Sequence, residues 1–140
     1  MTKNEIVNHL ASVPLFASLS KKELQAVAGA AKEVSRPAGD VLAAEGDSGV
    51  GFFLIIEGTA KVMVGGRTRR KLGPGEFFGE IALLDGGPRT ATVAAETPVK
   101  LLGLTAWVFK GLVQQNPGLA LKMLEVVAGR LRAASSSATD

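Results

Sequence analysis

One acid and one base, Glu80 and Arg89, frame the segment of this chain that is best equipped for chemistry. The segment reads FFGEIALLDGGPRTATV, and a short apolar run, two glycines and a proline separate the two charges. A short helix that begins near Gly79 would offer unpaired backbone N–H groups to an anion, and phosphate suits such a helix end best. Arg89 can bring a planar fork of donors to the same anion. The segment therefore predicts a phosphate site.

Glu80 cannot help to bind an anion, so it needs a different partner. A carboxylate accepts hydrogen bonds, and beside a phosphate it would be useful for a neighbouring hydroxyl. A phosphate next to a free hydroxyl describes the ribose of a nucleotide. One arginine and one helix end match a singly charged phosphate, and with a free 2′-hydroxyl this is the chemistry of a 3′,5′-cyclic nucleotide. When the two residues are taken alone, a surface salt bridge is the simpler alternative.

Composition sets the limits within which such a site must fit. The chain has 140 residues, of which 46% are hydrophobic and 21% charged, and this suits one globular domain. It has no cysteine, which excludes disulfide and thiolate chemistry. No apolar run approaches the ~20 residues that span a membrane, and the start MTKNEIVNHL lacks the apolar block of a signal peptide. We expect a cytoplasmic protein, and its net charge of +3 permits an anionic ligand.

The first part of the chain, to about Ala31, is expected to be helical. Ser20 and Glu23 have the spacing of a capping box, and apolar residues follow at helical intervals. Before this helix, the apolar connector VPLFASL is expected to dock on a core. His9 is the single histidine, and we expect it to be a solvated helix residue and no metal ligand.

Residues 32–103 are expected to form the β part of the fold. Short β-rich segments alternate with turn residues, and Gly65-Gly66 has the composition of a tight hairpin. About eight antiparallel strands predict a mainly β fold, an eight-stranded jelly roll or double-stranded β-helix. RTRRK, from Arg67 to Lys71, is expected to be a solvated strand, with a nucleic-acid patch as the less favoured alternative. The strand segments are EVSRPAGD, DVLAAEGD, GFFLIIEG, TAKVMVGG, RTRRKLGPG and TATVAAETPVKLLGL, the last holding two strands.

Two helices are expected to close the fold at about residues 105–134. Thr105 can cap the first, in which Trp107 is expected to be core or semi-buried. Pro117 suits the first position of the second helix, whose apolar stripe offers a surface for a homodimer or a partner protein. Residues 135–140 are small and polar and predict a disordered tail. The stripe consists of Leu121, Leu124, Val127 and Leu131.

Around Glu80 and Arg89 the sequence resembles the cyclic nucleotide-binding domain family. The phosphate-binding cassette of that family reads Gly-Glu-(Leu/Ile)-Ala-Leu, a short spacer, then Pro-Arg-small-Ala-(Thr/Ser). The resemblance extends from about Val13 to Leu131. Within the family, the pattern is similar to that of cyclic-AMP receptors, kinase regulatory subunits and gated channels. The resemblance implies a single domain over residues 1–134. The matching residues of the cassette are Gly79, Glu80, Ile81, Ala82, Leu83, Pro88, Arg89, Thr90, Ala91 and Thr92.

The resemblance implies a role for each site residue. Glu80 would accept a hydrogen bond from the ribose 2′-hydroxyl, and Arg89 would pair with the cyclic phosphate. Backbone N–H groups of Ile81 and Ala82 would complete the phosphate cradle that begins at Gly79. The base pocket would be lined by Val62, Val64 and Leu72, and one residue of the last helix, Val127, Arg130 or Leu131, would cap the base.

Thr90 bears on the choice of base. In the family, a Thr at this position helps cyclic-GMP-dependent kinases to hold guanine, and it also occurs in channels that take both nucleotides. We therefore expect cAMP and cGMP both to bind, cAMP more tightly. We expect no cofactor and no metal. A hydroxyl that stabilises the turn at the start of a strand is the alternative role for Thr90.

Three classes of function remain, and a binding and signalling module agrees with every feature above. A transcription regulator of the catabolite-activator type needs a helix-turn-helix after the last helix, and this sequence contains none, so we expect no direct DNA binding. The lack of a long apolar run leads us to expect no membrane contact either. An enzyme would need metal ligands or a nucleophile with a base, and none is visible.

The resulting expectation is a non-enzymatic, bacterial-type module whose C-terminal helices move when the ligand binds. Gly111, Asn116-Pro117 and Gly118 interrupt the helical run and supply the expected hinge. Met1 and the polar tail favour a complete small protein. The alternative is a ligand-sensing fragment of a larger Crp/Fnr-like transcription regulator, or of an enzyme or channel regulated by cAMP.

Overall fold

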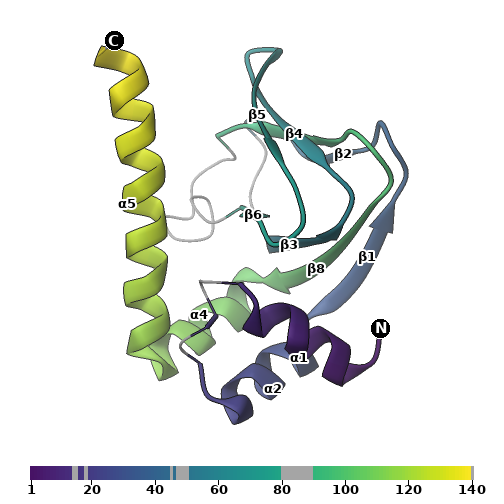
Figure 1. The fold of residues 1–140 in the computed structure, drawn as a ribbon, viewed down its shortest axis with the longest axis vertical. Helices are drawn as coiled ribbons and strands as arrows, with labels where there is room; N and C mark the ends of the chain where they lie inside the picture. Colours follow the sequence, from purple (N-terminus) through teal and green to yellow (C-terminus); the bar gives the residue numbers. More distant parts are fainter. Residues whose placement is uncertain (14–15, 18, 45, 47–50, 80–89, 140) are drawn as a thin grey trace. The chain divides into compact units, whose positions relative to one another are not determined.

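Two four-stranded antiparallel sheets make up the β part of the fold (Figure 1). The computed structural model describes the chain except for residues 14–15, 18, 45, 47–50, 80–89 and 140. The chain divides into two compact units, one made of Met1 with Ala30–Phe109 and the other of Thr2–Gly29 with Lys110–Asp140. The first unit holds the two sheets, and the second holds most of the helical residues.

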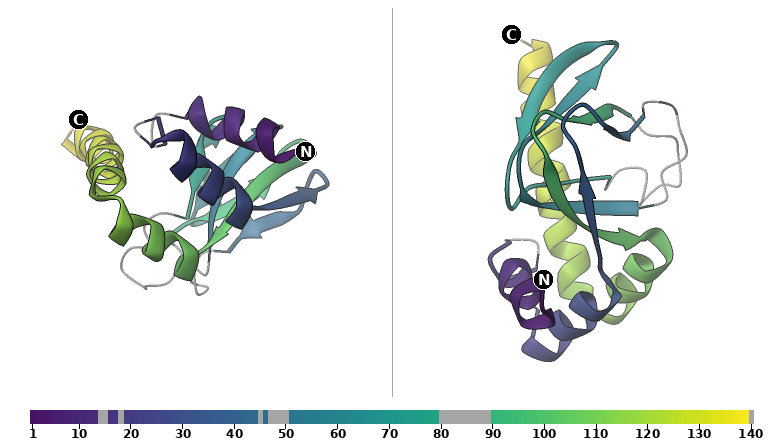
Figure 2. Two further views of the ribbon diagram at one scale, coloured as in Figure 1. Left: turned by 90° about the horizontal axis from the view of Figure 1, so that it is seen from below. Right: turned by 90° about the vertical axis from the view of Figure 1, so that its right-hand side faces the viewer.

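Each sheet joins strands that are distant in sequence. One sheet has the order β1-β8-β3-β6 and the other the order β2-β7-β4-β5, with antiparallel pairing throughout. This is the predicted jelly roll, and Figure 2 shows it from two further directions. The strands are β1 (Lys32–Arg36), β2 (Val41–Ala43), β3 (Gly51–Glu57), β4 (Ala60–Val64), β5 (Arg67–Leu72), β6 (Phe77–Phe78), β7 (Thr92–Ala95) and β8 (Val99–Thr105).

The core of the β unit draws on both sheets. Side chains alternate along a strand, so β3 and β8 present one apolar row to this core and a second apolar row on the opposite face. Burial on both faces explains why GFFLIIE reads as one continuous apolar run. The core cluster contains Ala43, Ile55, Ala60, Val62, Leu72, Phe78, Val93, Ala95, Val99 and Leu101. The second row contains the buried residues Phe52, Leu54, Leu102 and Leu104.

Two glycine turns fix the register of these strands. Gly65 and Gly66 have φ angles of +60° and +79° and join β4 to β5, so the predicted hairpin is confirmed. Gly58 follows β3 with a φ of +88°, and a Cβ atom there would collide with the carbonyl oxygen of Pro98. Only glycine therefore fits this turn.

Two helices with capping boxes begin the chain. In α1 (Lys3–Ala11), which carries the exposed His9, the Thr2 hydroxyl accepts a hydrogen bond from the Glu5 N–H. In α2 (Lys21–Ala30), the Glu23 N–H donates to Ser20 Oγ at 3.2 Å and the Ser20 N–H donates to Glu23 Oε1 at 2.9 Å. The predicted box at Ser20 is thus confirmed. The connector between the helices is buried at Val13, Phe16 and Leu19.

The two C-terminal helices begin at the predicted residues. The Val108 N–H donates to Thr105 Oγ1 at 3.3 Å at the start of α4 (Ala106–Gln115). Pro117 occupies the first position of α5, which spans Pro117–Thr139. Between them, Asn116 Nδ2 donates to the carbonyl oxygen of Leu112 at 3.0 Å, and this bond satisfies a carbonyl at the end of α4. Among the described residues, no helix combines the length and the apolarity that crossing a membrane requires.

Two expectations for this region are wrong. Trp107 is 86% exposed, not core or semi-buried, while Phe109 is 1% exposed. Residues two apart on a helix point in nearly opposite directions, so the first turn of α4 can bury only one of them. The tail that was expected to be disordered from residue 135 is helical to Thr139, where it continues α5 with no glycine or proline to end the helix.

Candidate ligand-binding site

The segment that carries most of the predicted phosphate site connects the two sheets. It holds Glu80, Ile81, Ala82 and Arg89, which lie outside the described residues, so the roles of these four stay predictions. The chain enters the segment from β6, the edge strand of one sheet, and leaves it into β7, an inner strand of the other sheet.

Gly79 marks the beginning of that segment. It directly follows β6 and has a φ of +96°, a left-handed conformation that a residue with a Cβ atom adopts only with strain. The glycine that the cassette pattern requires is therefore also required by the local backbone. This supports its predicted place at the start of the phosphate cradle.

Two of the three predicted base-pocket residues belong to the core of the β unit. Val62 is 8% exposed, Leu72 is fully buried, and both belong to the core cluster. The register pairs Ala60 with Leu72 and Val62 with Arg70, so the side chains of Val62 and Leu72 lie on the same face of the β4–β5 hairpin. Val64 is half-buried at the end of β4.

The second end of the segment returns beside the same hairpin. Met63 pairs with Thr92 and Val62 with Val93, so the chain enters β7 next to the end of β4 that carries Val64. Thr90 lies two residues before β7 and is exposed. Thr90 thus precedes β7 on the side where β7 runs beside the Val64 end of β4.

Arg70 is a residue of this face that the sequence reasoning missed. Val93, Val62 and Arg70 form one row across three neighbouring strands, and the row runs from two buried valines to an exposed arginine. The two-residue spacing between Arg70 and Leu72 was the available signal. It was hidden because RTRRK reads as a uniformly charged run, and Arg67–Lys71 are indeed exposed, as expected of a solvated strand.

The three candidate residues for capping the base lie on α5, in the other compact unit. Val127 is half-buried and Leu131 is 66% exposed. The backbone of Arg130 is helical, and its side chain lies outside what the structure describes. The choice among the three stays open, and their capping role stays a prediction.

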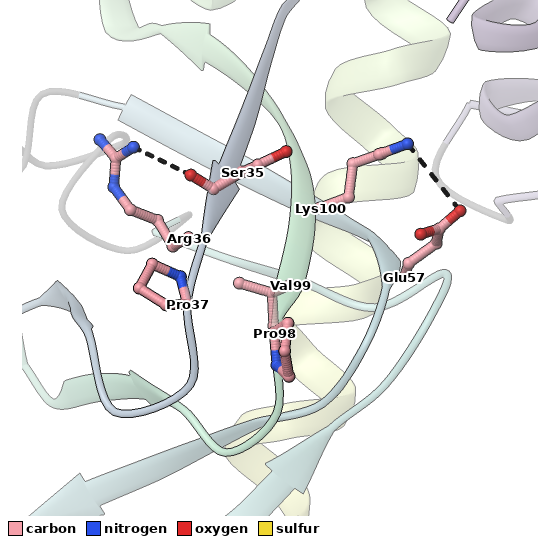
Figure 3. A pocket seen from close by; sticks show the side chains of 7 residues that line it. All are labelled: Ser35, Arg36, Pro37, Glu57, Pro98, Val99 and Lys100. Atoms are coloured by element: carbon pink, nitrogen blue, oxygen red, sulfur yellow. Dashed lines mark hydrogen bonds and ion pairs between the residues drawn. The ribbon is translucent and has the colours of Figure 1, made fainter.

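A hollow of about 390 Å³ at the end of the sheet formed by β1, β8 and β3 contains none of the predicted ligand residues (Figure 3). Pro37 and Pro98 form part of its wall. Lys100 Nζ lies 4.0 Å from Glu57 Oε1, and Arg36 Nη1 donates to the carbonyl oxygen of Ser35 at 3.1 Å. These charged groups already have partners on an exposed surface, so we assign no ligand to this hollow.

Among the residues that the structure describes, Glu33 of β1 is the one group whose pKa is clearly shifted. The N-terminal ammonium of Met1 donates to Glu33 Oε2 at 3.0 Å, and Lys100 Nζ lies 3.5 Å from Glu33 Oε1. The hydrogen bond from the ammonium is the largest cause of the lowered pKa of Glu33. Desolvation opposes this shift, and the positive charges of the ammonium and Lys100 add to it. This cluster contains none of the predicted ligand residues.

Comparison with known proteins identifies the family of the chain. Residues 33–116 match the family model described as "Cyclic nucleotide-binding domain". The chain is 38% identical over 128 residues to a cyclic nucleotide-gated potassium channel of Mesorhizobium japonicum, covering 91% of this chain and 36% of the relative. It is 39% identical over 106 residues to a cAMP-dependent protein kinase regulatory subunit of Aspergillus niger, covering 74% and 26%.

A solved structure agrees with these relatives. The catabolite activator protein of Thermus thermophilus superimposes with a TM-score of 0.82 and 32% identity, over 90% of this chain and 62% of that one. The chain spans only about a quarter to a third of the two relatives matched by sequence. The family match covers more than half of the chain, and the fold agrees with it. The chain belongs to the cyclic nucleotide-binding domain family.

Proposed function

We propose that this chain binds cAMP, and cGMP more weakly, and passes the occupancy of the site to its C-terminal helices. The observation that carries the proposal is the complete cassette, from Gly79 to Thr92, inside a family match over residues 33–116. A related kinase regulatory domain has been solved with cAMP, and at 32% identity it covers 79% of this chain. The proposed module performs no catalysis and acts in the cytoplasm.

Each residue of the cassette has a proposed task. Arg89 forms charge-assisted hydrogen bonds with the cyclic phosphate. The backbone N–H groups of Ile81 and Ala82 complete the cradle, and Glu80 accepts a hydrogen bond from the ribose 2′-hydroxyl. The left-handed Gly79 supports this assignment because it allows the backbone to turn closely around an anion.

The base is proposed to lie against the inner face of the β4–β5 hairpin. Val62 and Leu72 share that face, and Val64 continues it towards the hairpin turn. An apolar wall suits the faces of a purine ring, and Thr90 stands where a hydroxyl can reach the base or the phosphate. One of the three α5 residues, Val127, Arg130 or Leu131, then closes the far side.

The response is proposed to run through α4 and α5. A ligand shifts such an equilibrium only by binding one arrangement of the helices better than the other. The break at Asn116, just before Pro117, supports a hinge, since the α-helical backbone is interrupted there between α4 and α5. Leu121, Leu124 and Leu131 are 59–66% exposed on α5, and this apolar face supports contact with a second copy or a partner protein. The alternative is that the chain acts as part of a larger regulator, channel or enzyme, because it spans only part of the length of its relatives.

Thermal unfolding with each nucleotide tests the proposal directly. At a hundredfold excess over the dissociation constant, binding to the folded state stabilises it by ~2.7 kcal/mol. In a chain of 140 residues this raises the melting temperature by several degrees. If millimolar cAMP and cGMP both leave the melting curve unchanged, the proposed function is wrong.

Arg89→Ala is the matched negative variant for that experiment. Removing one partner of a desolvated charge pair costs ~2–5 kcal/mol of binding free energy. Glu80→Ala should cost less, because its hydrogen-bonding partner is a neutral hydroxyl. Calorimetric titration should therefore rank the affinities as parent, Glu80→Ala, Arg89→Ala. Binding by folded Arg89→Ala within about threefold of the parent would contradict the assigned role, since ~2 kcal/mol predicts a larger loss.

A further inference from the structure

We infer that the open edge of strand β5 is a docking site for a short acidic segment of a partner protein, which pairs with this edge as an added strand. Such a docking site goes beyond the proposed function, because it uses the outward edge of the β4–β5 hairpin and needs no nucleotide. The hairpin then carries two separate surfaces, an inner face towards the core and a charged edge towards solvent.

The positive charge of the chain is concentrated on this hairpin. Residues 58–75 hold five of the 16 lysines and arginines and none of the 13 acidic residues. The rest of the chain therefore has 11 cations against 13 anions, so the hairpin is strongly positive in a chain that is otherwise slightly negative. Such a concentration of charge attracts an anionic partner and orients it as it approaches. The five cations are Lys61, Arg67, Arg69, Arg70 and Lys71.

Little of this charge is neutralised within the molecule. Lys71 Nζ lies 3.1 Å from Glu96 Oε2, and the lysine side chain is still 64% exposed. Among the described residues, no carboxylate lies within ion-pair distance of Lys61, Arg67 or Arg69. Lys61 also pairs directly with Lys71 across the two strands, and like charges in that position repel each other. A carboxylate from outside would relieve this repulsion.

The backbone of β5 offers a second kind of contact. Among the described strands, β5 pairs only with β4, and it ends the strand order β2-β7-β4-β5. An edge strand presents unpaired N–H and C=O groups along its open side. Another polypeptide strand supplies both donors and acceptors to such an edge, whereas a phosphate group supplies acceptors alone. Residues 58–75 also contain no aromatic side chain on which a base could stack. The edge therefore favours an acidic peptide over a nucleic acid or an anionic membrane.

The same charges exclude a second copy of this chain as the partner. Two β5 strands paired edge to edge would bring arginines and lysines together, and charged side chains are a common way to block such pairing. Val62 pairs with Arg70 and Met63 with Thr68, so Arg69 is the extra residue of a bulge. A bulge increases the local twist of its strand. The edge therefore suits a short acidic segment and not a long regular strand.

The test is a titration of the isotopically labelled chain, without nucleotide, with terminally blocked peptides slightly longer than the six-residue strand β5. A peptide of alternating glutamate and threonine should shift the amide NMR signals of β5, and its affinity should fall as salt screens the charges. The same peptide methylated on alternate amide nitrogens keeps every charge and loses backbone donors, so it should bind roughly fivefold or more weakly. A peptide of alternating lysine and threonine should not bind.

Two double variants locate the contact. Arg67→Gln combined with Arg69→Gln removes two charges from the edge and should weaken the binding of the glutamate peptide about two- to thirtyfold. Lys21→Gln combined with Lys22→Gln is the matched control, because it removes the same charge from two exposed residues of α2. This control should change the affinity by less than about twofold, because salt screens charges that are distant from the peptide.

Four results would overturn the docking site. The glutamate peptide could leave the signals of β5 unchanged, or the two double variants could weaken its binding equally, which would assign it to net charge alone. Undiminished binding of the methylated peptide would show that the backbone edge is not used. Tighter binding of a short DNA duplex or of phosphatidylserine vesicles, lost in the arginine double variant, would make the hairpin a nucleic-acid or membrane surface.

A variant that does not fold leaves the docking site testable. Should the arginine double variant fail to fold, Arg67→Gln alone is compared with Lys21→Gln by the same titration. The outcome is also independent of the proposed function, because thermal unfolding with cAMP and cGMP tests nucleotide binding without any peptide.

Discussion

The two sheets of the β unit are built from the same number of strands, yet they face their surroundings differently. In the sheet β1-β8-β3-β6, the two central strands are buried on both faces, with Ile55 and Leu101 towards the core cluster and Leu54 and Leu102 on the opposite side. In the sheet β2-β7-β4-β5, strand β5 is exposed along its length until Leu72. One sheet is therefore a covered layer, and the other keeps a solvated hairpin.

This difference shows how one fold separates stability from recognition. A strand that is buried on both faces has little freedom to change, because each side chain fits a close-packed environment. The hairpin of β4 and β5 buries only its inner face, and it is there that the predicted base pocket lies. Substitutions in the two sheets should therefore separate loss of folding from loss of binding.

The largest effect is expected in the covered sheet. Leu102 is 2% exposed on β8, and Leu102→Ala should lower the free energy of unfolding by ~2–5 kcal/mol, because it removes a buried side chain and leaves a cavity. Denaturant unfolding measures this loss. Under conditions where the variant is folded, its affinity for cAMP should match that of the parent, and a large loss of affinity would break the contrast between the sheets.

A smaller loss of stability, combined with weaker binding, is expected for Val62→Ala. The side chain is shorter, so the cost in unfolding free energy should be about 1–3 kcal/mol. Val62 also faces the proposed base pocket, so both nucleotides should bind more weakly than to Leu102→Ala. Unfolding curves and calorimetry on the two variants provide the comparison. Unaltered affinity in Val62→Ala would make Val62 a core residue alone.

Thr90→Ala tests whether the hydroxyl just before β7 contributes to the choice between guanine and adenine. One hydrogen bond is worth ~0.5–1.5 kcal/mol net, so cGMP should bind roughly two- to twelvefold more weakly. The affinity for cAMP should change less, because adenine lacks the 2-amino group that the hydroxyl is expected to meet. Parallel titrations of parent and variant measure both changes. An equal loss for the two nucleotides would assign Thr90 to the phosphate or to the turn before β7.

The smallest effect concerns the polar edge of the covered sheet, and it depends on pH. The lowered pKa of Glu33 means that its carboxylate stabilises the fold at neutral pH and that this contribution is lost as the pH falls through the lowered pKa. Glu33→Gln should therefore melt slightly below the parent at neutral pH, and the two should converge in acid. Glu57→Gln is the control, since its carboxylate is 69% exposed and lies 4.0 Å from Lys100. A gap that widens in acid would contradict the proposed cause.

Much of this architecture could be predicted because local chemistry and tertiary structure agree. The capping box of Ser20 and Glu23 needs only four residues of sequence, and the glycine pair at residues 65–66 specifies its own turn. Strand β6 was missed because two phenylalanines show no periodicity, and the strand exists through its pairing with Phe53 and Leu54 of β3. Long-range pairing of this kind leaves no local signal.

The candidate site also divides into residues with a local sequence signal and residues whose place depends on long-range strand pairing. The cassette is continuous in sequence, so its pattern predicted Glu80 and Arg89, and their geometry stays a prediction because residues 80–89 are not described. Arg70 was missed because RTRRK reads as a uniformly charged run, and the pairing of Val62 with Arg70 shows the face that Arg70 shares with Leu72. Trp107 was misplaced because an aromatic residue in an apolar helix reads as core, while the packing of Phe109 decides which side of the helix faces inward.

The exposure of Trp107 gives the protein an optical label of its own. It is the single tryptophan in the chain, so all indole fluorescence comes from the first turn of α4, and its 86% exposure leaves the ring open to dissolved quenchers. Phe109, two residues on, is 1% exposed and stacks on Phe52 of β3 with ring centroids 5.4 Å apart, which ties that turn to the covered sheet. A rearrangement of the turn would alter the access of iodide or acrylamide to the indole. Quenching curves with and without nucleotide can therefore follow α4 in the unlabelled parent.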